Sequence, residues 1–398
     1  MNRWLLPENI ADVLPVQARK VEELRRIALD LYRSYGYELV TPPLLEFLDS
    51  LLTGTGSDLN LQTFKLVDQV SGRTLGLRAD MTPQVARIDA HLLNRSTVTR
   101  LCYAGSVAHV RAPAGSSSRE ELQLGAEIYG CATWEADFEA VSLLLNTLQL
   151  AGLNRVHLDL SHAGILQGIL ADTVLSSEQT ESLYLLLLSK DRPRLQAWVA
   201  DLPPSISKPL LALTELNGPC DEVIKKARKG KLALPAHSDI NKALDDLERL
   251  NKLLSNLPYS ADLALDLSVD LADLRGYQYH SGVMFAAYID GLPQPLARGG
   301  RYDHVGQAFG RSRPATGFSL DLFTLAALSK LDVRVKAILA PWLDDADLQR
   351  TITQLRSQGE TVIQAIRGEL IESEEFSCDR ELVKQGSAWQ VQSRTENS

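Results

Sequence analysis

Residues 261–271 read ADLALDLSVDL, and this stretch decides the fold class because apolar and polar residues alternate along it. The apolar positions, which an extended chain would carry on one face, are Leu263, Leu265, Leu267 and Val269. A period of two predicts an antiparallel strand with one buried face. A helical pattern at residues 240–254 precedes it, and strands that follow long helices indicate an α+β sheet.

Two segments near the N-terminus extend this picture. Residues 18–35 carry apolar residues at helical spacing, which predicts an amphipathic helix that ends at Gly36. Residues 35–47 (YGYELVTPPLLEF) then favour an extended segment. Because Pro42 and Pro43 cannot donate ladder hydrogen bonds, we expect this segment at a sheet edge or at an interface.

A strand that runs into a helix is predicted at residues 75–93 (LGLRADMTPQVARIDAHLL). Thr82 suits the N-cap of this helix, and Pro83 suits its first helical position. The polar side chains of such a strand-to-helix junction often face a cleft, so this segment is a candidate wall of a binding site.

A hairpin is predicted at residues 100–130, with the glycine- and serine-rich stretch AGSSS at residues 114–118 as its tip. Alternation along the two strands divides their polar side chains between faces. One face would carry His109 and Arg111, and another would carry Arg119, Gln123 and Glu127.

A second hairpin is predicted at residues 281–303 (SGVMFAAYIDGLPQPLARGGRYD), with its turn at residues 290–291. Its second strand ends in Gly299 and Gly300, whose lack of side chains would let the backbone approach a ligand closely. The following residues 315–328 suit a strand that leads into a helix.

The chain divides into a discontinuous core and two additions. We expect the core in residues 1–162 and 259–331, a helical insertion in residues 163–258, and a small C-terminal α/β unit in residues 332–398. In the last unit, the pattern predicts a helix at residues 345–358 and strands at residues 335–341, 361–366 and 388–392.

Composition excludes several classes of protein. The 398 residues carry a net charge of −9, which is the wrong balance for binding through nucleic-acid phosphates. No apolar run approaches the roughly 20 residues of a membrane span, so we expect a cytoplasmic protein. The four cysteines are isolated in the sequence, which favours free thiols over a metal site; they are Cys102, Cys131, Cys220 and Cys378. No cofactor-binding motif is present.

Six short blocks occur in an order that resembles one family. They are YGYELVTPPLLE (residues 35–46), LRADMTPQ (77–84), QLGAEIYG (123–130), LRGYQYHSG (274–282), GGRYD (299–303) and ATGFSLDL (315–322). In this order they resemble the histidyl-tRNA synthetases, and over its whole length the chain is most similar to their paralogues, the regulatory subunits of ATP phosphoribosyltransferase. The resemblance implies a class II synthetase-like α+β fold, with a mixed, mainly antiparallel sheet flanked by helices.

The resemblance also implies a histidine-binding pocket. A buried zwitterion needs acceptors for its ammonium, a donor for its carboxylate and a polar partner for its imidazole. By similarity, Arg275 would face the carboxylate and Tyr279 would lie by the imidazole. The residues that would receive the ammonium and orient the main-chain end are Asp80, Thr82, Gln123 and Glu127. Taken singly, these residues favour structural roles: Asp80 and Thr82 suit a helix cap, Gln123 and Glu127 a solvated strand face, and Arg275 a surface cation. Taken as a set that matches one family, they favour the binding site. Residues that the pocket could also include are Arg111, Arg119 and His280.

Departures from the synthetase pattern indicate that this pocket does not activate an amino acid. His109 stands where motif 2 would supply an arginine, and Thr324 stands where motif 3 would supply another. Adenylate formation needs cations around the phosphate on which charge develops, and loss of one donor costs roughly a hundredfold to a thousandfold in rate. Arg111 is two residues from His109 and could replace its charge. No other catalytic constellation is present.

A non-catalytic regulatory subunit is therefore what the resemblance implies, for the enzyme that condenses ATP with phosphoribosyl pyrophosphate at the start of histidine biosynthesis. Its expected partners are the short-form catalytic subunit and a second copy of the chain, which would join through the motif-1 region within a hetero-oligomer. L-histidine would be its feedback effector, and closure of residues 114–118 or of the loop at Gly276 would carry the signal. Because the chain is acidic and its C-terminal unit short, tRNA is not an expected partner. The alternatives are an active histidyl-tRNA synthetase and a free-standing amino-acid-binding protein.

Overall fold

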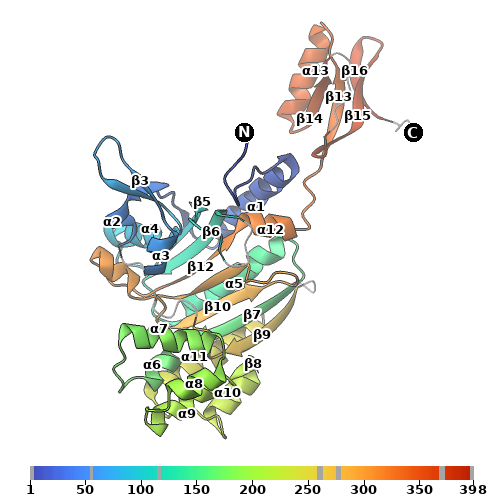
Figure 1. The fold of residues 1–398 in the computed structure, drawn as a ribbon. Helices are drawn as coiled ribbons and strands as arrows, with labels where there is room; N and C mark the ends of the chain where they lie inside the picture. Colours follow the sequence, from blue (N-terminus) through green and yellow to red (C-terminus); the bar gives the residue numbers. More distant parts are fainter. Residues whose placement is uncertain are drawn as a thin grey trace. The chain divides into compact units, whose positions relative to one another are not determined.

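The computed structural model describes residues 4–53, 57–113, 118–257, 263–274, 279–366 and 373–394 (Figure 1). They form two compact units, of which the first contains residues 1–11 and 24–329 and the second contains residues 12–23 and 330–398. The first unit contains a nine-stranded and a three-stranded sheet, and the second contains a four-stranded sheet. No helix in the described ranges is long and apolar enough to cross a bilayer.

The first unit is built on a nine-stranded sheet with the order β1-β5-β6-β12-β11-β10-β7-β9-β8. Only the pairs β1/β5 and β7/β9 are parallel, so the sheet is mixed and mainly antiparallel, as predicted. The strands span Glu38–Leu39 (β1), Thr99–Ala108 (β5), Glu120–Tyr129 (β6), Arg155–His162 (β7), Asn217–Pro219 (β8), Ala264–Asp270 (β9), Val283–Tyr288 (β10), Ala297–Arg301 (β11) and Ala315–Asp321 (β12).

Strand β9 corrects one prediction. Its alternation is real, since Val269 is buried whereas Ala264 and Asp266 are exposed. The strand pairs antiparallel with β8 but parallel with β7, its other neighbour. The long helical segment between β7 and β9 permits such a crossover. The alternation of apolar and polar residues therefore identified the buried face of β9, but it did not show whether the neighbouring strands run parallel or antiparallel to it.

The edge position predicted for residues 35–47 is confirmed for the two short strands that form there: β1 is the first strand of the nine-stranded sheet and pairs with β5, and β2 (Leu45–Phe47) is an edge strand of a second, three-stranded sheet. Pro42 and Pro43 lie between these strands. The preceding helix α1 (Pro15–Ser34) ends before Gly36, which has a φ of +85°. Tyr32 of α1 is fully buried, its ring meets that of Phe318 edge-on at 6.0 Å, and its hydroxyl accepts a hydrogen bond from Thr147 of α5 (Trp134–Leu150). These contacts cover one face of the sheet with helices.

Residues 75–93 form the predicted strand and helix, β4 (Thr74–Leu77) and α4 (Thr82–Arg87), and the helix continues as the π-helix η1 (Ile88–Leu93). Thr82 is not the N-cap, because Met81 holds that position. The Thr82 N–H instead donates to Asp80 Oδ1 at 3.0 Å. Strand β4 lies in a three-stranded sheet between β2 (Leu45–Phe47) and β3 (Phe64–Val67), next to helices α2 (Leu48–Leu51) and α3 (Ser57–Gln62).

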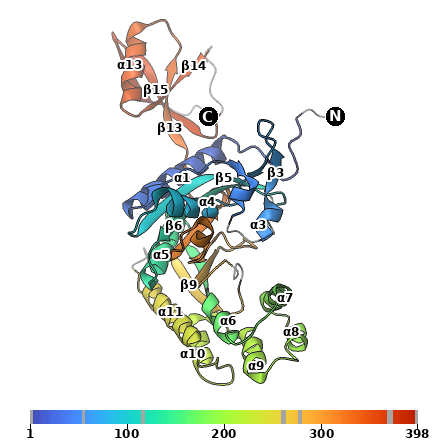
Figure 2. The same ribbon diagram turned by 90° about the vertical axis from the view of Figure 1, so that its left-hand side faces the viewer.

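The helical insertion gathers at one end of the first unit (Figure 2). Its apolar helix faces pack together, and α11 lies against α6 and α5. The insertion also supplies the edge strand β8, which the sequence patterns did not predict. Its helices are α6 (Ala163–Ile169), α7 (Ser177–Leu188), α8 (Arg192–Trp198), α9 (Pro204–Leu213), α10 (Cys220–Arg228) and α11 (Ser238–Ser255).

The second unit contains a four-stranded sheet with the order β14-β13-β15-β16 and the helix α13 (Ala346–Ser357). Three predicted strands are present, as β13 (Val335–Pro341), β14 (Thr361–Ala365) and β16 (Ala388–Ser393). The fourth, β15 (Phe376–Gln385), was missed because its sequence mixes charged and apolar residues and only Leu382 is buried. The core residues of this unit are Ile338, Ala340, Leu348, Ile352, Val362 and Leu382.

Candidate functional site

Two cavities lie on the face of the nine-stranded sheet opposite α1 and α5. The small cavity has a volume of about 250 Å³, and the large cavity has a volume of about 690 Å³. Asp80, Arg298 and Ser319 line both, so the cavities adjoin. The side chains of the small cavity come from the α4 junction, β6, β11, β12 and the segment before β10; the principal ones are Asp80, Thr82, Glu127, Tyr279, His280, Arg298 and Tyr302.

Glycines form the floor of the small cavity. Gly317 of β12 pairs with Glu127 of β6 on one side and with Gly300 of β11 on the other. Two residues further along β6, the missing side chain of Gly125 leaves room for the ring of Tyr103, because a Cβ at residue 125 would lie 2.4 Å from that ring. The missing side chains allow Tyr103 and Glu127 to lie flat on the sheet.

Glu127 is the most deeply buried acid of the small cavity, with 1% of its surface exposed. The Tyr103 hydroxyl donates to Glu127 Oε1 at 3.0 Å, and the Tyr302 hydroxyl donates to Oε2. Burial raises the pKa of Glu127 to about 8, although the two tyrosine hydrogen bonds oppose this shift. A protonated carboxyl is therefore the main form at pH 7, and a ligand that offers a proton donor or a positive charge would favour ionisation.

Asp80 and Gln123 hold each other in place at the cavity wall. Gln123 Nε2 donates to Asp80 Oδ1 at 2.9 Å, and Gln123 Oε1 accepts the N–H of Met81 at 2.8 Å. The hydroxyl of Thr82 lies 3.1 Å from that of Tyr103, which links it to Glu127. The structure thus brings Asp80, Thr82, Gln123 and Glu127 together, with Gln123 lining the large cavity rather than the small one.

Tyr279 and His280 form the aromatic wall. The ring of Tyr279 lies 5.1 Å from that of Tyr302 and meets the His280 ring edge-on at 5.5 Å. The Tyr279 hydroxyl is buried and has no hydrogen-bond partner within the described residues, so it is available to a ligand in the cavity.

Gly299 and Gly300 serve packing as well as the cavity lining. A Cβ at residue 299 would lie 2.4 Å from the Phe285 ring, and one at residue 300 would lie 2.6 Å from His280 Cδ2. The glycine pair therefore lets the side chains of Phe285 and His280 approach the backbone of β11. The sequence patterns had predicted such a close approach only for a ligand.

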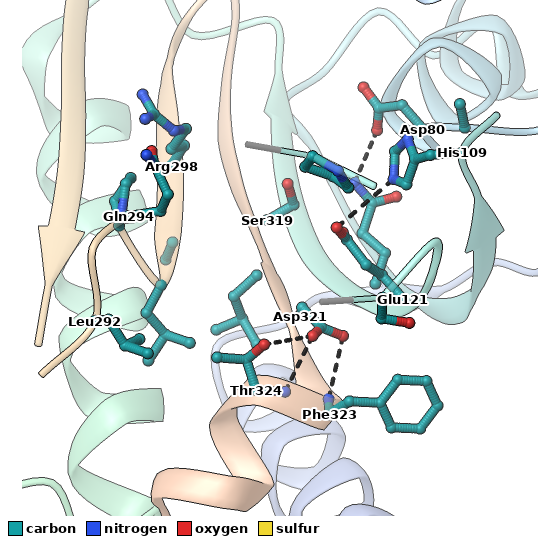
Figure 3. Close-up of a pocket in the computed structure, with 18 of the residues that line it drawn as sticks. Asp80, His109, Glu121, Leu292, Gln294, Arg298, Ser319, Asp321, Phe323 and Thr324 are labelled. Carbon is teal, nitrogen blue, oxygen red and sulfur yellow. Dashed lines mark hydrogen bonds and ion pairs between the residues drawn. The ribbon is translucent and has the colours of Figure 1, made fainter. Parts of the chain in front are cut away.

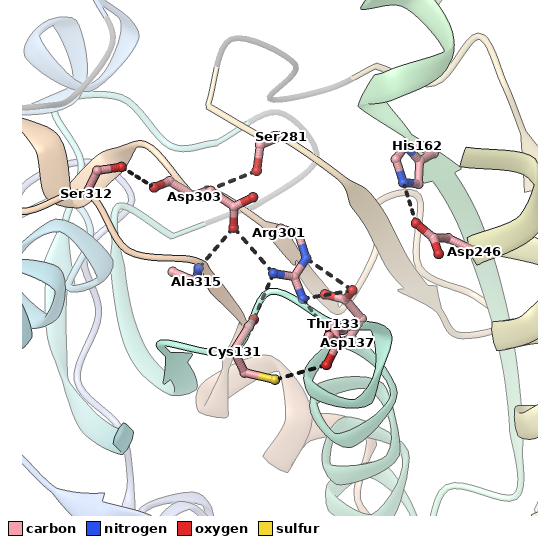
Figure 4. A network of polar contacts seen from close by, with 10 residues as sticks. All are labelled: Cys131, Thr133, Asp137, His162, Asp246, Ser281, Arg301, Asp303, Ser312 and Ala315. Atoms are coloured by element: carbon pink, nitrogen blue, oxygen red, sulfur yellow. Dashed lines mark hydrogen bonds and ion pairs between the residues drawn. The ribbon is translucent and has the colours of Figure 1, made fainter. Parts of the chain in front are cut away.

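A buried ion pair anchors the segment that carries this wall (Figure 4). Arg301 of β11 donates to Asp137 Oδ2 from Nη2 at 3.0 Å and from Nε at 3.1 Å, and to the Cys131 carbonyl at 3.0 Å. The Ser281 N–H donates to the Arg301 carbonyl, and the Ser281 hydroxyl accepts the N–H of Asp303 at 2.9 Å. These bonds tie residue 281, next to His280, to the end of β11.

Three of the arginines suggested by the sequence stand apart from this arrangement or cannot be placed. Arg275 lies outside the described residues. Arg111 is exposed and lines neither cavity. Arg119 stacks over the ring of Phe64 at 4.8 Å and donates to the His109 carbonyl at 3.1 Å, also outside both linings. Arg111 therefore does not replace the charge missing at His109.

Arg298 is a cavity residue that the sequence patterns did not identify. It lines the small and large cavities and also a third of about 60 Å³ that borders them. Its place in the sequence, directly before Gly299 and Gly300, was the available signal. Within the described residues that line these cavities, it is the one arginine or lysine.

The large cavity contains the two positions at which a synthetase would carry arginines (Figure 3). At one of them, Thr324 is bound to the protein itself: its N–H and hydroxyl donate to Asp321 Oδ2 at 3.0 and 2.6 Å. Asp321 Oδ1 accepts the N–H groups of Phe323 and Leu122, each at 3.1 Å. The carboxylate thus caps helix α12 (Leu322–Leu328), where an anionic ligand would otherwise meet free N–H groups.

At the other position, His109 is buried, with 7% of the residue exposed, and Glu121 Oε1 lies 3.7 Å from its Nε2. Glu121, Asp80 and Asp321 add three carboxyl groups to the lining. A triphosphate in this cavity would meet more acids than cations, so the lining does not favour nucleotide binding. Among the described residues, no group of three histidine, cysteine or acidic side chains could hold a metal ion.

Comparisons with known proteins agree with this fold. The sequence pattern of the histidyl-tRNA synthetase family matches residues 9–325, and that of the C-terminal domain of the ATP phosphoribosyltransferase subunit HisZ matches residues 335–392. The crystal structure of an ATP phosphoribosyltransferase regulatory subunit/histidyl-tRNA synthetase from Bacillus halodurans is 26% identical, with a TM-score of 0.79 over 93% of this chain and 94% of that one. A histidyl-tRNA synthetase from Nostoc sp. PCC 7120 shares the fold at 17% identity, with a TM-score of 0.76 over 96% of this chain and 92% of that one.

Two curated relatives match over nearly their whole lengths. The ATP phosphoribosyltransferase regulatory subunit of Polynucleobacter necessarius subsp. necessarius is 71% identical over 99% of this chain and 100% of its own. That of Polynucleobacter asymbioticus is 69% identical over the same shares. The chain therefore belongs to the family of ATP phosphoribosyltransferase regulatory subunits, which act in histidine biosynthesis and are themselves non-catalytic.

Proposed function

We propose that the small cavity binds free L-histidine and that this binding is the signal which the regulatory subunit passes to the catalytic subunit. The observation that carries the proposal is the hydroxyl of Tyr279, which has no hydrogen-bond partner among the described residues and is buried beside Glu127 and its two tyrosines. An aromatic wall with one acid and one open hydroxyl suits an imidazole, which has a flat ring and two nitrogens that need partners.

The location of each side chain in the cavity indicates which part of histidine it would contact. Glu127 and Tyr279 lie at the aromatic wall, so in this proposal they contact the imidazole edge. Asp80 and Thr82 lie at the α4 junction and receive the ammonium, with Gln123 keeping Asp80 in place. This arrangement moves Glu127 from the ammonium, where the resemblance had put it, to the ring.

Regulation requires that histidine bind the inhibited and active states with different affinity, because equal affinity would shift nothing. The moving element that we propose is the loop at residues 114–118 or the loop at Gly276. Residues 114–117 and 275–278 lie outside the described residues, so the proposal depends on their sequences. Limited proteolysis with and without histidine tests it, and cleavage rates that histidine leaves unchanged in both loops would reject it.

The catalytic partner in this proposal is the short form of ATP phosphoribosyltransferase, and a second copy of the chain completes the regulatory dimer. Exposed apolar side chains on the motif-1 segment and on β3, which belongs to the same three-stranded sheet as β2, support the dimer, because a contact would bury them. They are Leu39 (55% exposed), Leu44 (46%), Leu45 (43%), Leu66 (47%) and Val67 (71%). In this proposal the complex is cytoplasmic and does not bind tRNA. The boundaries that we propose for the core, the helical insertion and the C-terminal unit follow residues 162, 258 and 331.

Calorimetric titration of the purified chain with L-histidine tests the proposed function. We expect saturable binding of one ligand per chain, no response to L-glutamine, and at least a tenfold rise in Kd for Glu127→Gln (~1.4 kcal/mol). Glu178→Gln, on the exposed side of α7, is the matched control and should bind as the parent does. Absence of histidine binding, or equal affinity in the Glu127 variant, would reject the proposal. ATP–pyrophosphate exchange with histidine should be absent, which separates this function from that of a synthetase.

A further inference from the structure

We propose that Arg298 binds the carboxylate of the amino acid in the small cavity and thereby makes the site selective for amino acids over their decarboxylated or reduced analogues. The inference rests on the proposed histidine site. The resemblance assigns the carboxylate to Arg275, whereas Arg298 has no assigned role in it.

Strand register gives the first argument. Arg298 pairs with Ser319 of β12 on one side and with Ala286 of β10 on the other. Gly300 and Gly317, two residues along from Arg298 and Ser319, form the floor of the small cavity. Side chains two residues apart on a strand share a face, and diagonal cross-strand neighbours are roughly 7–8 Å apart. Arg298 thus shares the ligand face and can extend over glycines that offer no side chain to obstruct it.

Charge gives the second argument. Within the described part of the chain, Arg298 is the one arginine or lysine that lines the small cavity, whose other ionisable lining includes Asp80 and Glu127. A zwitterion whose ammonium is held by Asp80 brings a carboxylate that needs a cation or several donors. Figure 3 shows Arg298 across the large cavity from Asp80, and both residues also line the small cavity, so the α-carbon of a ligand between them could present its ammonium to one and its carboxylate to the other.

Position between the cavities gives the third argument. Arg298 lines the large cavity as well as the small one, and so does Ser319, its cross-strand neighbour. A ligand whose imidazole lies against Tyr279 and Glu127 therefore has its main-chain end at the junction of the two cavities. Because Glu121 and Asp321 add negative charge to the large cavity, Arg298 supplies the local counter-charge that a carboxylate needs there.

Ligand analogues separate the contribution of the carboxylate from that of the ring. Full-length protein and its Arg298→Gln and Arg298→Lys variants are titrated with L-histidine, L-histidinol and histamine, and Arg155→Gln serves as the control. Arg155 is also a strand arginine, but it pairs on the surface with Asp266 and lines no described cavity. Circular dichroism melts verify that each variant is folded.

Arg298→Gln should raise the Kd for L-histidine roughly 10-fold to 100-fold, as expected for a lost charge-assisted hydrogen bond. Its Kd values for histidinol and histamine should change less than about twofold, and Arg298→Lys should recover part of the histidine affinity. Added salt should weaken histidine binding to the parent protein more than to Arg298→Gln. Unchanged histidine affinity, an equal loss for all three ligands, or an equal salt response in both proteins would overturn the inference. If the parent protein binds no histidine, the proposed function itself fails.

Discussion

Gly317 lies opposite Glu127 in the pairing of β12 with β6, and a Cβ on residue 317 would lie only 1.7 Å from Glu127 Oε2. The position of the buried Glu127 carboxyl therefore depends on a glycine that is 190 residues (317 − 127) further along the sequence. The same Cβ would lie 2.5 Å from the carbonyl oxygen of Ala126. A side chain at residue 317 would displace both the acid and the strand beside it.

Gly317→Ala should destabilise the protein by about 1–3 kcal/mol, as expected for overpacking in a closely packed region, and should abolish histidine binding. Urea unfolding and calorimetric titration measure the two effects. In the double variant with Glu127→Ala, part of the lost stability should return because one of the two clashes is removed. If the two substitutions instead add in their effect on the free energy of unfolding, residue 317 and Glu127 are not coupled as the structure indicates.

Glu127 should make stability fall as the pH rises. Its pKa is about 8 in the folded chain, above the reference value of 4.5, so between these values the folded state binds a proton that the unfolded state has lost. The free energy of unfolding should decrease through this window by at most about 1.4 kcal/mol per pH unit. Urea unfolding at pH 5.5 and pH 7.5 measures the slope. Glu127→Gln, which cannot ionise, should have a shallower slope, and an unchanged slope would contradict the assignment.

Asp321→Ala should cost about 1–2 kcal/mol of stability, because the N–H groups of Phe323 and Thr324 lose their acceptor at the start of α12. Asp321→Asn should cost less, since an amide oxygen can still accept. Neither variant should catalyse ATP–pyrophosphate exchange, because removal of an acid does not supply the missing arginines. Thermal melts and the exchange assay measure these outcomes. A stable Asp321→Ala protein would mean that this cap contributes little.

Asp137→Ala should be strongly destabilising, by up to about 3–5 kcal/mol, because the buried guanidinium of Arg301 loses the carboxylate that it contacts through Nε and Nη2 and keeps the longer contact to Asp303 Oδ1 at 3.3 Å. Histidine affinity should fall as well, since Arg301 and Asp303 hold residue 281 beside the aromatic wall. Asp266→Ala removes the exposed partner of Arg155 and should cost about 0–1 kcal/mol. Chemical unfolding of both variants tests the contrast, which similar losses at the two sites would contradict.

Local sequence patterns predicted most of the secondary structure, and the resemblance pointed to six residues that line the two cavities, namely Asp80, Thr82, Gln123, Glu127, Tyr279 and His280. The junction at residues 77–84 and the strand at residues 120–129 place Asp80, Thr82, Gln123 and Glu127 together, as expected from their blocks. The patterns missed β8 and β15, since the first has three residues and the second has almost no buried face. They also missed Arg298, whose one local signal was its place directly before Gly299 and Gly300.

The sequence by itself determined most of the residues that are helical or extended, which strand faces are apolar, and to which family the blocks point. These properties depend on neighbours a few positions apart, so they can be read from spacing. Only the tertiary structure decided the parallel pairing of β9, the cap at Asp321, the position of Arg298 and the raised pKa of Glu127. The physical reason is distance along the chain: Tyr302, which binds Glu127, is 175 residues away, and burial by such distant groups has no signature in a local pattern.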